Sequence, residues 1–161
     1  MKLMGKLRKT PEEYREEAEK YFVDGFNCAQ SVFLAFAEEL GLDGDTALKI
    51  SSSFGGGMGR LREVCGAVSG MFMVLGMRCG YTSPEADSEK AELYRKVQEL
   101  AGKFKEENQT IICRELLDLR INGADSHKPE VRTPEYYKNR PCAKFVGDAA
   151  YLTAKFVEEN G

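Results

Sequence analysis

The chain has 161 residues, a length that fits one domain with its own hydrophobic core. Its 23 Lys and Arg residues and 26 Asp and Glu residues give a formal net charge of -3, with both signs mixed along the chain. This balance argues against a nucleic-acid-binding surface. The longest apolar run, Val64 to Met77, contains three glycines and a serine, so no membrane span is expected. Residues 1–9 lack an apolar h-region, so no secretory signal is expected.

The first two helices are predicted from their N-terminal caps. The pattern Thr10–Glu13 combines a capping box with proline at the first helical position, and predicts a helix that runs to about Val23. Asn27 predicts the cap of a second helix that begins at Cys28. Apolar residues then recur every three or four positions until Gly41, where this helix is expected to end.

The middle of the chain contains a glycine-rich break followed by an apolar helix. Asp45 is the predicted cap of a shorter helix that extends through Ser53. The stretch from Phe54 to Arg60 contains four glycines and is expected to interrupt regular structure. A buried helix is predicted from about residue 65 to residue 77, at the centre of the fold.

Three further helices are predicted in the second half of the chain. Ser83-Pro84 indicates the start of a long amphipathic helix. Asn108 or Thr110 is expected to cap a short helix that carries Cys113. Residues 124–140 are predicted to form a polar loop with one short turn at residues 135–137.

The final helix is predicted to open at Pro141, with Cys142 beside it. No segment shows the period of two that marks a half-buried strand. The sequence therefore predicts an all-α, single-domain helical bundle of about six to seven helices that spans residues 1–161.

Four of the five cysteines fall within about one turn of a predicted helix start, namely Cys28, Cys65, Cys113 and Cys142. The positive end of a helix dipole stabilises a thiolate, which is the form that attacks disulfides or binds metals. The chain has no Cys-x-x-Cys pair, so a shared site requires four helix N-termini that converge. Cys79 follows the end of the buried helix, where the dipole disfavours a thiolate, and is expected to lie apart from the other four.

Cys65 is the predicted attacking thiol. It lies between the glycine-rich segment with Arg60 and Arg62 and the sequence Gly66–Gly70. The two arginines and the helix start are expected to lower the pKa of its thiol. The glycines at 66 and 70 leave a flat helix face that a cofactor or another backbone can approach. The alternative is that the cysteine fills the core and the glycines only pack helices.

The histidine content limits the metal chemistry available to the chain. His127 is the only histidine and lies in the polar loop, where a solvated surface position is expected. A zinc site with two histidines is therefore excluded. The usual nucleotide-binding motifs are also missing from the sequence.

The segments Phe26–Val32 and Cys65–Gly70, together with Cys113–Leu116 and Pro141-Cys142, resemble the C-GCAxxG-C-C family of redox-active proteins. The resemblance covers nearly the whole chain. It implies a small, mostly helical protein in which the four cysteines outside position 79 are redox or metal-binding residues. A similar domain accompanies haem in split-Soret cytochromes, which keeps an iron–sulfur or electron-transfer role open. Covalent haem is not expected, because Cys-x-x-Cys-His is absent.

Three functions remain open at this stage. The first is thiol–disulfide redox with an unknown redox partner and no cofactor, as in a thiol–disulfide oxidoreductase. The second is an iron–sulfur cluster or a zinc ion bound by Cys28, Cys65, Cys113 and Cys142. The third is a helical interaction protein, for example a homodimer, with core cysteines. A cytoplasmic location is expected, because free thiols and metal thiolates are common there.

Overall fold

A computed structural model describes residues 6–160 of the chain. The expectation of no secretory signal concerns residues 1–9, and residues 1–5 of this segment lie outside the described residues. The elements are α1 (Pro11–Val23), α2 (Cys28–Phe36), α3 (Gly44–Ser51), η1 (Ser52–Phe54), α4 (Gly55–Met58), α5 (Gly66–Cys79), α6 (Asp87–Asn108), α7 (Cys113–Leu116), α8 (Pro134–Asn139) and α9 (Cys142–Asn160). Within residues 6–160 there is no strand, so the all-α prediction is confirmed.

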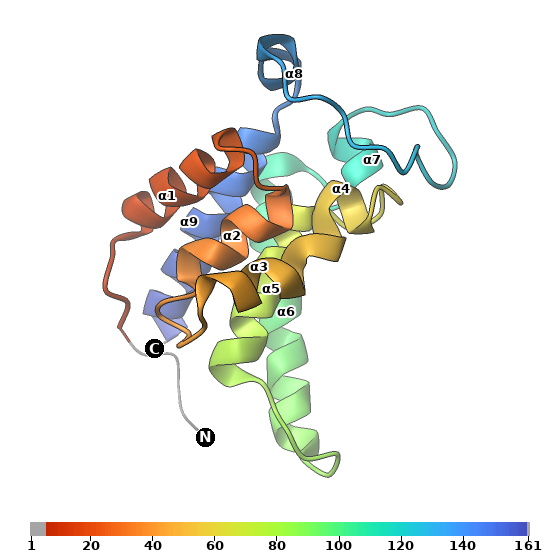
Figure 1. Cartoon of the computed structure of the whole chain (residues 1–161). Helices are drawn as coiled ribbons and strands as arrows, with labels where there is room; N and C mark the ends of the chain where they lie inside the picture. Colours follow the sequence, from red (N-terminus) through yellow and green to blue (C-terminus); the bar gives the residue numbers. More distant parts are fainter. Residues whose placement is uncertain (1–5, 161) are drawn as a thin grey trace.

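The apolar helix α5 lies at the centre of the bundle, as predicted. It packs against α2, α6 and α9, while α1 lies along α9 (Figure 1). The buried side chains of these helices form one hydrophobic cluster, with Tyr14 stacked on Phe36 at 4.3 Å between ring centroids. The described part of the chain contains nine α-helices, two of them (α4 and α7) with only four residues, against the six to seven predicted.

Several predicted helix boundaries are wrong by one to a few residues. α2 ends at Phe36, and turns lead to Gly41, whose φ of 72° suits glycine. Asp43 rather than Asp45 caps α3, through a hydrogen bond from the Thr46 amide. α5 continues through Cys79, because the apolar core extends to its last turn.

The second half of the chain also differs from its predicted boundaries. α6 begins at Asp87, after a loop that contains Pro84. Neither Asn108 nor Thr110 is the cap of α7, since the N-cap position is Ile112. The predicted turn at residues 135–137 is part of the longer helix α8.

Figure 1 shows that α4, α7 and α8 lie at the end of the bundle away from the C-terminus. The N-termini of α2, α5 and α9 open toward the same end. Among the helices of residues 6–160, none combines the length and apolar character needed to cross a membrane.

Candidate functional site

Four cysteines stand at the starts of four helices. Cys28, Cys113 and Cys142 are the first residues of α2, α7 and α9, and Cys65 is the N-cap of α5. The start of α2 is well defined, because the Asn27 side chain accepts a hydrogen bond from the Gln30 amide at 2.9 Å. The helix-start placement predicted for all four cysteines is therefore confirmed.

A cavity of about 300 Å³ brings these four cysteines together. Cys28 is half-buried, and the other three are at most 8% exposed. The sequence-based expectation that the helix N-termini converge on one site is confirmed. The side chains that share the cavity wall include Arg60, Arg62, His127, Glu130, Arg132, Tyr136 and Arg140.

Backbone pairing holds Cys65 beside the start of α7. The Cys65 amide donates to the Ile111 carbonyl at 2.8 Å, and the Cys113 amide donates to the Glu63 carbonyl at 2.6 Å. Val64 and Ile112 form an isolated antiparallel bridge between these bonds. Periodicity in the sequence gives no signal for such a short pairing.

The glycine-rich segment forms a left-handed turn that closes one side of the cavity. Residues 56–60 all have φ between 62° and 70°, and the Gly59 amide donates to the Gly55 carbonyl at 2.9 Å. Glycine adopts this conformation at low cost, which explains the composition of the segment. Gly57 also allows a close approach, because a Cβ there would lie 2.6 Å from the Cβ of Cys113.

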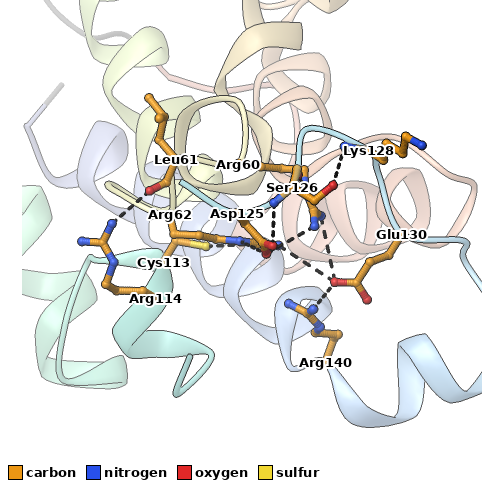
Figure 2. Close-up of polar contacts among 10 residues, drawn as sticks. All are labelled: Arg60, Leu61, Arg62, Cys113, Arg114, Asp125, Ser126, Lys128, Glu130 and Arg140. Atoms are coloured by element: carbon orange, nitrogen blue, oxygen red, sulfur yellow. Dashed lines mark hydrogen bonds and ion pairs between the residues drawn. The ribbon is translucent and has the colours of Figure 1, made fainter. Parts of the chain in front are cut away.

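Arg62 leaves this turn and contacts Cys113. Its Nη1 lies 3.5 Å from the Cys113 Sγ, and its Nη2 lies 2.9 Å from Asp125 Oδ2. The Arg62 side chain is buried, and its charge is balanced by an ion pair with Asp125, on the loop before α8. Figure 2 shows this contact together with Arg60, which also pairs with Asp125 at 3.2 Å.

The environment of Cys65 differs from the prediction. Burial raises the pKa of the Cys65 thiol to about 12, although hydrogen bonds from the Val68 and Ala67 amides at the start of α5 oppose this shift. Arg62 contacts Cys113 and not Cys65. At Cys113 the effect of burial is larger than the effect of the arginine, so the pKa of Cys113 is also raised. The expectation that the arginines lower the pKa of Cys65 is therefore wrong.

Cys142 is the cysteine whose pKa is lowered. The first cause is a hydrogen bond from the Cys28 thiol, and the charges of Arg140, Arg62 and Arg132 act in the same direction against burial. The pKa of Cys28 is correspondingly raised well above its ordinary value, because its proton is shared with Cys142 and its thiol is buried. Within the pair, Cys142 therefore loses its proton more readily than Cys28.

The glycines proposed to face a cofactor pack against α2. A Cβ at Gly66 would lie 3.2 Å from the Cys28 Cβ, and one at Gly70 would lie 2.9 Å from the Val32 Cβ. Gly66 reaches the cavity wall, whereas Gly70 is not part of it. Of the two expected neighbours of this face, a cofactor or another backbone, the structure has the backbone of α2 at Gly70, which leaves no open cofactor face there.

Cys79 and His127 lie where their local sequence suggested. Cys79 is outside the cavity wall, and its thiol donates to the Leu75 carbonyl at 3.2 Å, one turn earlier in α5. His127 is an exposed residue at the rim of the cavity.

The sequence places Glu130, Arg132 and Arg140 in a polar loop and does not connect them with the cysteines. Glu130 pairs with Arg140 and lies 3.9 Å from Arg60 (Figure 2). Arg132 donates to the carbonyls of Phe22 and Phe26 at 2.9 and 3.0 Å. The only signal in the sequence was the proximity of Arg140 to Cys142.

The cysteines provide donor atoms that suit zinc or iron, but their geometry does not form a ready ligand set. Within residues 6–160, no three histidine, cysteine, aspartate or glutamate side chains are arranged to hold a metal ion. A four-thiolate site would therefore require the sulfur atoms to move.

Comparison with known proteins identifies a family for most of the chain. No curated protein and no solved structure matches it. One family model, described as "Putative redox-active protein (C_GCAxxG_C_C)", matches residues 26–156. This range contains the four cysteines of the cavity, the left-handed turn and the arginine-bearing loop. The chain therefore belongs to the C_GCAxxG_C_C family of redox-active proteins.

Proposed function

We propose that this protein carries out thiol–disulfide exchange, with Cys142 as the attacking thiolate and Cys28 as the resolving thiol. The observation that carries the proposal is that Cys28 and Cys142 line one cavity from the starts of α2 and α9, where the interaction with Cys28 lowers the pKa of Cys142. A lowered pKa increases the thiolate fraction of Cys142, and Cys28 supplies a second thiol in the same cavity. A thiolate with a neighbouring thiol is the arrangement that disulfide exchange requires.

The exchange proceeds in two balanced steps. The Cys142 thiolate attacks one sulfur of a substrate disulfide, so that a mixed disulfide forms and the other substrate half leaves as a thiolate. The Cys28 sulfur then attacks the Cys142 sulfur after losing its proton to that leaving thiolate. The second substrate half leaves as a thiolate, and two electrons have passed from the protein dithiol to the substrate.

Cys65 and Cys113 have no attacking role in this proposal. Burial raises the pKa of both thiols, so they remain protonated at neutral pH. They line the same cavity and shape the surroundings of the reacting pair. Changing either to serine should slow exchange without abolishing it.

The pairing can be tested by mass spectrometry of the oxidised full-length protein under non-reducing conditions. The expected product is a disulfide between Cys28 and Cys142, which is lost in Cys142→Ser and in Cys28→Ser. Cys79→Ser is the matched control and should retain it. Exclusive pairing of Cys65 with Cys113, or no disulfide after treatment with a small disulfide, would refute the proposed roles.

A bound metal is the second candidate, because all four cysteines line one cavity. Protein purified without oxygen should then contain about one zinc ion or one iron–sulfur cluster per chain. Each of the four Cys→Ser changes should lower that content, because each removes a ligand. Metal content that is negligible, or that is insensitive to these changes, favours disulfide exchange.

The remaining alternative, an interaction protein with core cysteines, accounts for Cys79 but not for four cysteines around one cavity.

We infer a cytoplasmic location from the free cysteines, since a reducing compartment keeps such thiols available. A homodimer stays a prediction.

A further inference from the structure

The cavity around the cysteines carries an excess of positive charge. Its wall contains the guanidinium groups of Arg60, Arg62, Arg132 and Arg140. Two carboxylates pair with this set, Glu130 in the wall and Asp125 behind it. Two positive charges are left over, so the site retains a net positive charge.

Arg132 supplies a fixed cation in the cavity. Its guanidinium lies over the Phe22 ring at 4.4 Å and donates to two backbone carbonyls, those of Phe22 and Phe26. Among residues 6–160, no Asp or Glu carboxylate forms an ion pair with Arg132. This cation is held in place by neutral partners, so its charge is available to an anion.

Glu130 shows that a carboxylate fits among the other arginines. Its Oε1 pairs with Arg140 and lies 3.9 Å from Arg60 and 4.0 Å from Arg62. The Glu130 side chain is 41% exposed, so this carboxylate sits at the open side of the cavity. A substrate carboxylate can replace it there with the same charge complementarity.

The size of the cavity and the burial of its sulfurs indicate a small substrate. A volume of about 300 Å³ is at the lower end of small-molecule sites. Cys142 is only 8% exposed, which disfavours the approach of a disulfide in a folded protein. A cavity of this size suits a small, flexible disulfide.

We propose that the oxidant of this protein is a small anionic disulfide, whose carboxylates bind Arg132 and Arg140 while its sulfur faces Cys142. The inference rests on the proposed exchange reaction and names its substrate class. The Cys142 thiolate attacks the disulfide, one anionic half leaves as a thiol, and Cys28 displaces the second half. The product is the Cys28–Cys142 disulfide and two small anionic thiols.

Three disulfides of matched size test the charge preference on the reduced full-length protein at about pH 7. They are 3,3′-dithiodipropionate with two carboxylates, 2-hydroxyethyl disulfide with no charge, and cystamine with two ammonium groups. Each rate is divided by the rate of the same disulfide with free 2-mercaptoethanol. The expected order is anionic, neutral, cationic, with at least about tenfold between the first and last. Raising the ionic strength from about 0.01 M to about 1 M should reduce this ratio.

Variants separate binding of the anion from reactivity of the thiolate. Arg132→Gln should lower the ratio of anionic to neutral rates by about threefold or more, because the neutral disulfide corrects for any change at Cys142. Glu130→Gln should raise the same ratio, since a competing carboxylate is removed. Arg95→Gln is the matched control on the exposed face of α6 and should leave the ratio unchanged.

The outcomes distinguish this inference from the exchange reaction itself. If all three disulfides react at similar normalised rates, or cystamine reacts fastest, the anionic substrate class is wrong while exchange stands. If none of them oxidises the wild-type protein, the exchange reaction is wrong. An unchanged ratio in Arg132→Gln would contradict the assigned role of that residue even when the anionic disulfide is preferred.

Discussion

Cys28, at the start of α2, and Cys142, at the start of α9, line the same cavity. These positions are more than a hundred residues apart in the sequence, yet they lie together in a cavity bordered by arginines. Their interaction makes the two cysteines unequal, because it lowers the pKa of Cys142 and raises the pKa of Cys28. That asymmetry is the basis of the first prediction.

Alkylation by iodoacetamide should identify Cys142 as the thiol that reacts first near neutral pH. Its lowered pKa increases the thiolate fraction, so its rate should rise through a midpoint below that of an ordinary cysteine, near 8.5. Cys142→Ser should remove the fast phase. Cys28→Ala should move the midpoint to higher pH, because the thiol that lowers the pKa of Cys142 is lost.

Cys79→Ser is the control for this titration, because Cys79 is bonded within α5 and lies outside the cavity wall. The fast phase should be unchanged in it. A fast phase that disappears in Cys65→Ser and persists in Cys142→Ser would contradict the assignment and support the original expectation for Cys65.

Gly57→Ala should reduce stability. The residue has a φ of 70°, and a Cβ would lie 2.6 Å from the Cys113 Cβ and 2.8 Å from the Arg62 Cα. The backbone conformation alone should lower the free energy of unfolding by about 1–2 kcal/mol. Gly102 lies in the middle of α6, and an added Cβ there would meet no atom within 4 Å. Gly102→Ala should therefore raise the free energy of unfolding by about 0.5–1 kcal/mol. Urea titrations of both variants check the opposite signs.

Met58→Gly should increase stability. Met58 has a φ of 70° in the left-handed turn, a conformation that costs a residue with a Cβ roughly 1–2 kcal/mol. Glycine removes that cost, so a gain of about 1 kcal/mol in the free energy of unfolding is expected. Met77→Gly, in right-handed α5 and 47% exposed, should instead lose about 0.5–1 kcal/mol. Equal losses in both variants would argue against the left-handed turn.

Asp148→Asn should destabilise the protein in a pH-dependent way. Burial tends to raise the pKa of Asp148, but hydrogen bonds from Lys144 at 2.6 Å and Arg15 at 2.8 Å outweigh it and lower the pKa. A carboxylate with a lowered folded-state pKa contributes stability above its unfolded pKa, about 3.9, and loses it as the pH falls through the folded value.

The variant should therefore lose about 1–3 kcal/mol of unfolding free energy at neutral pH and approach wild type in strong acid. Asp24→Asn is the control, because the Asp24 pair with Lys20 is exposed and contributes little. A loss that is constant from neutral to acid pH would show that Asp148 acts by shape rather than by charge.

The sequence by itself determined that four cysteines stand within about one turn of a helix start. A cap such as Asn27 bonds to an amide three residues away, so the signal is local and readable from the chain. The run of glycines also indicated a break in regular structure at the left-handed turn, because glycine adopts positive φ at low cost.

Only the tertiary structure decided which cysteine has a lowered pKa. The arginines closest in sequence to Cys65 turn toward Cys113 and Asp125, and burial outweighs the helix start at Cys65. Cys142 instead interacts with Cys28, with Arg140 two residues before it, and with the cations Arg62 and Arg132 from other segments. Charge interactions and burial depend on distances in space, and periodicity along a chain does not encode which distant side chains meet.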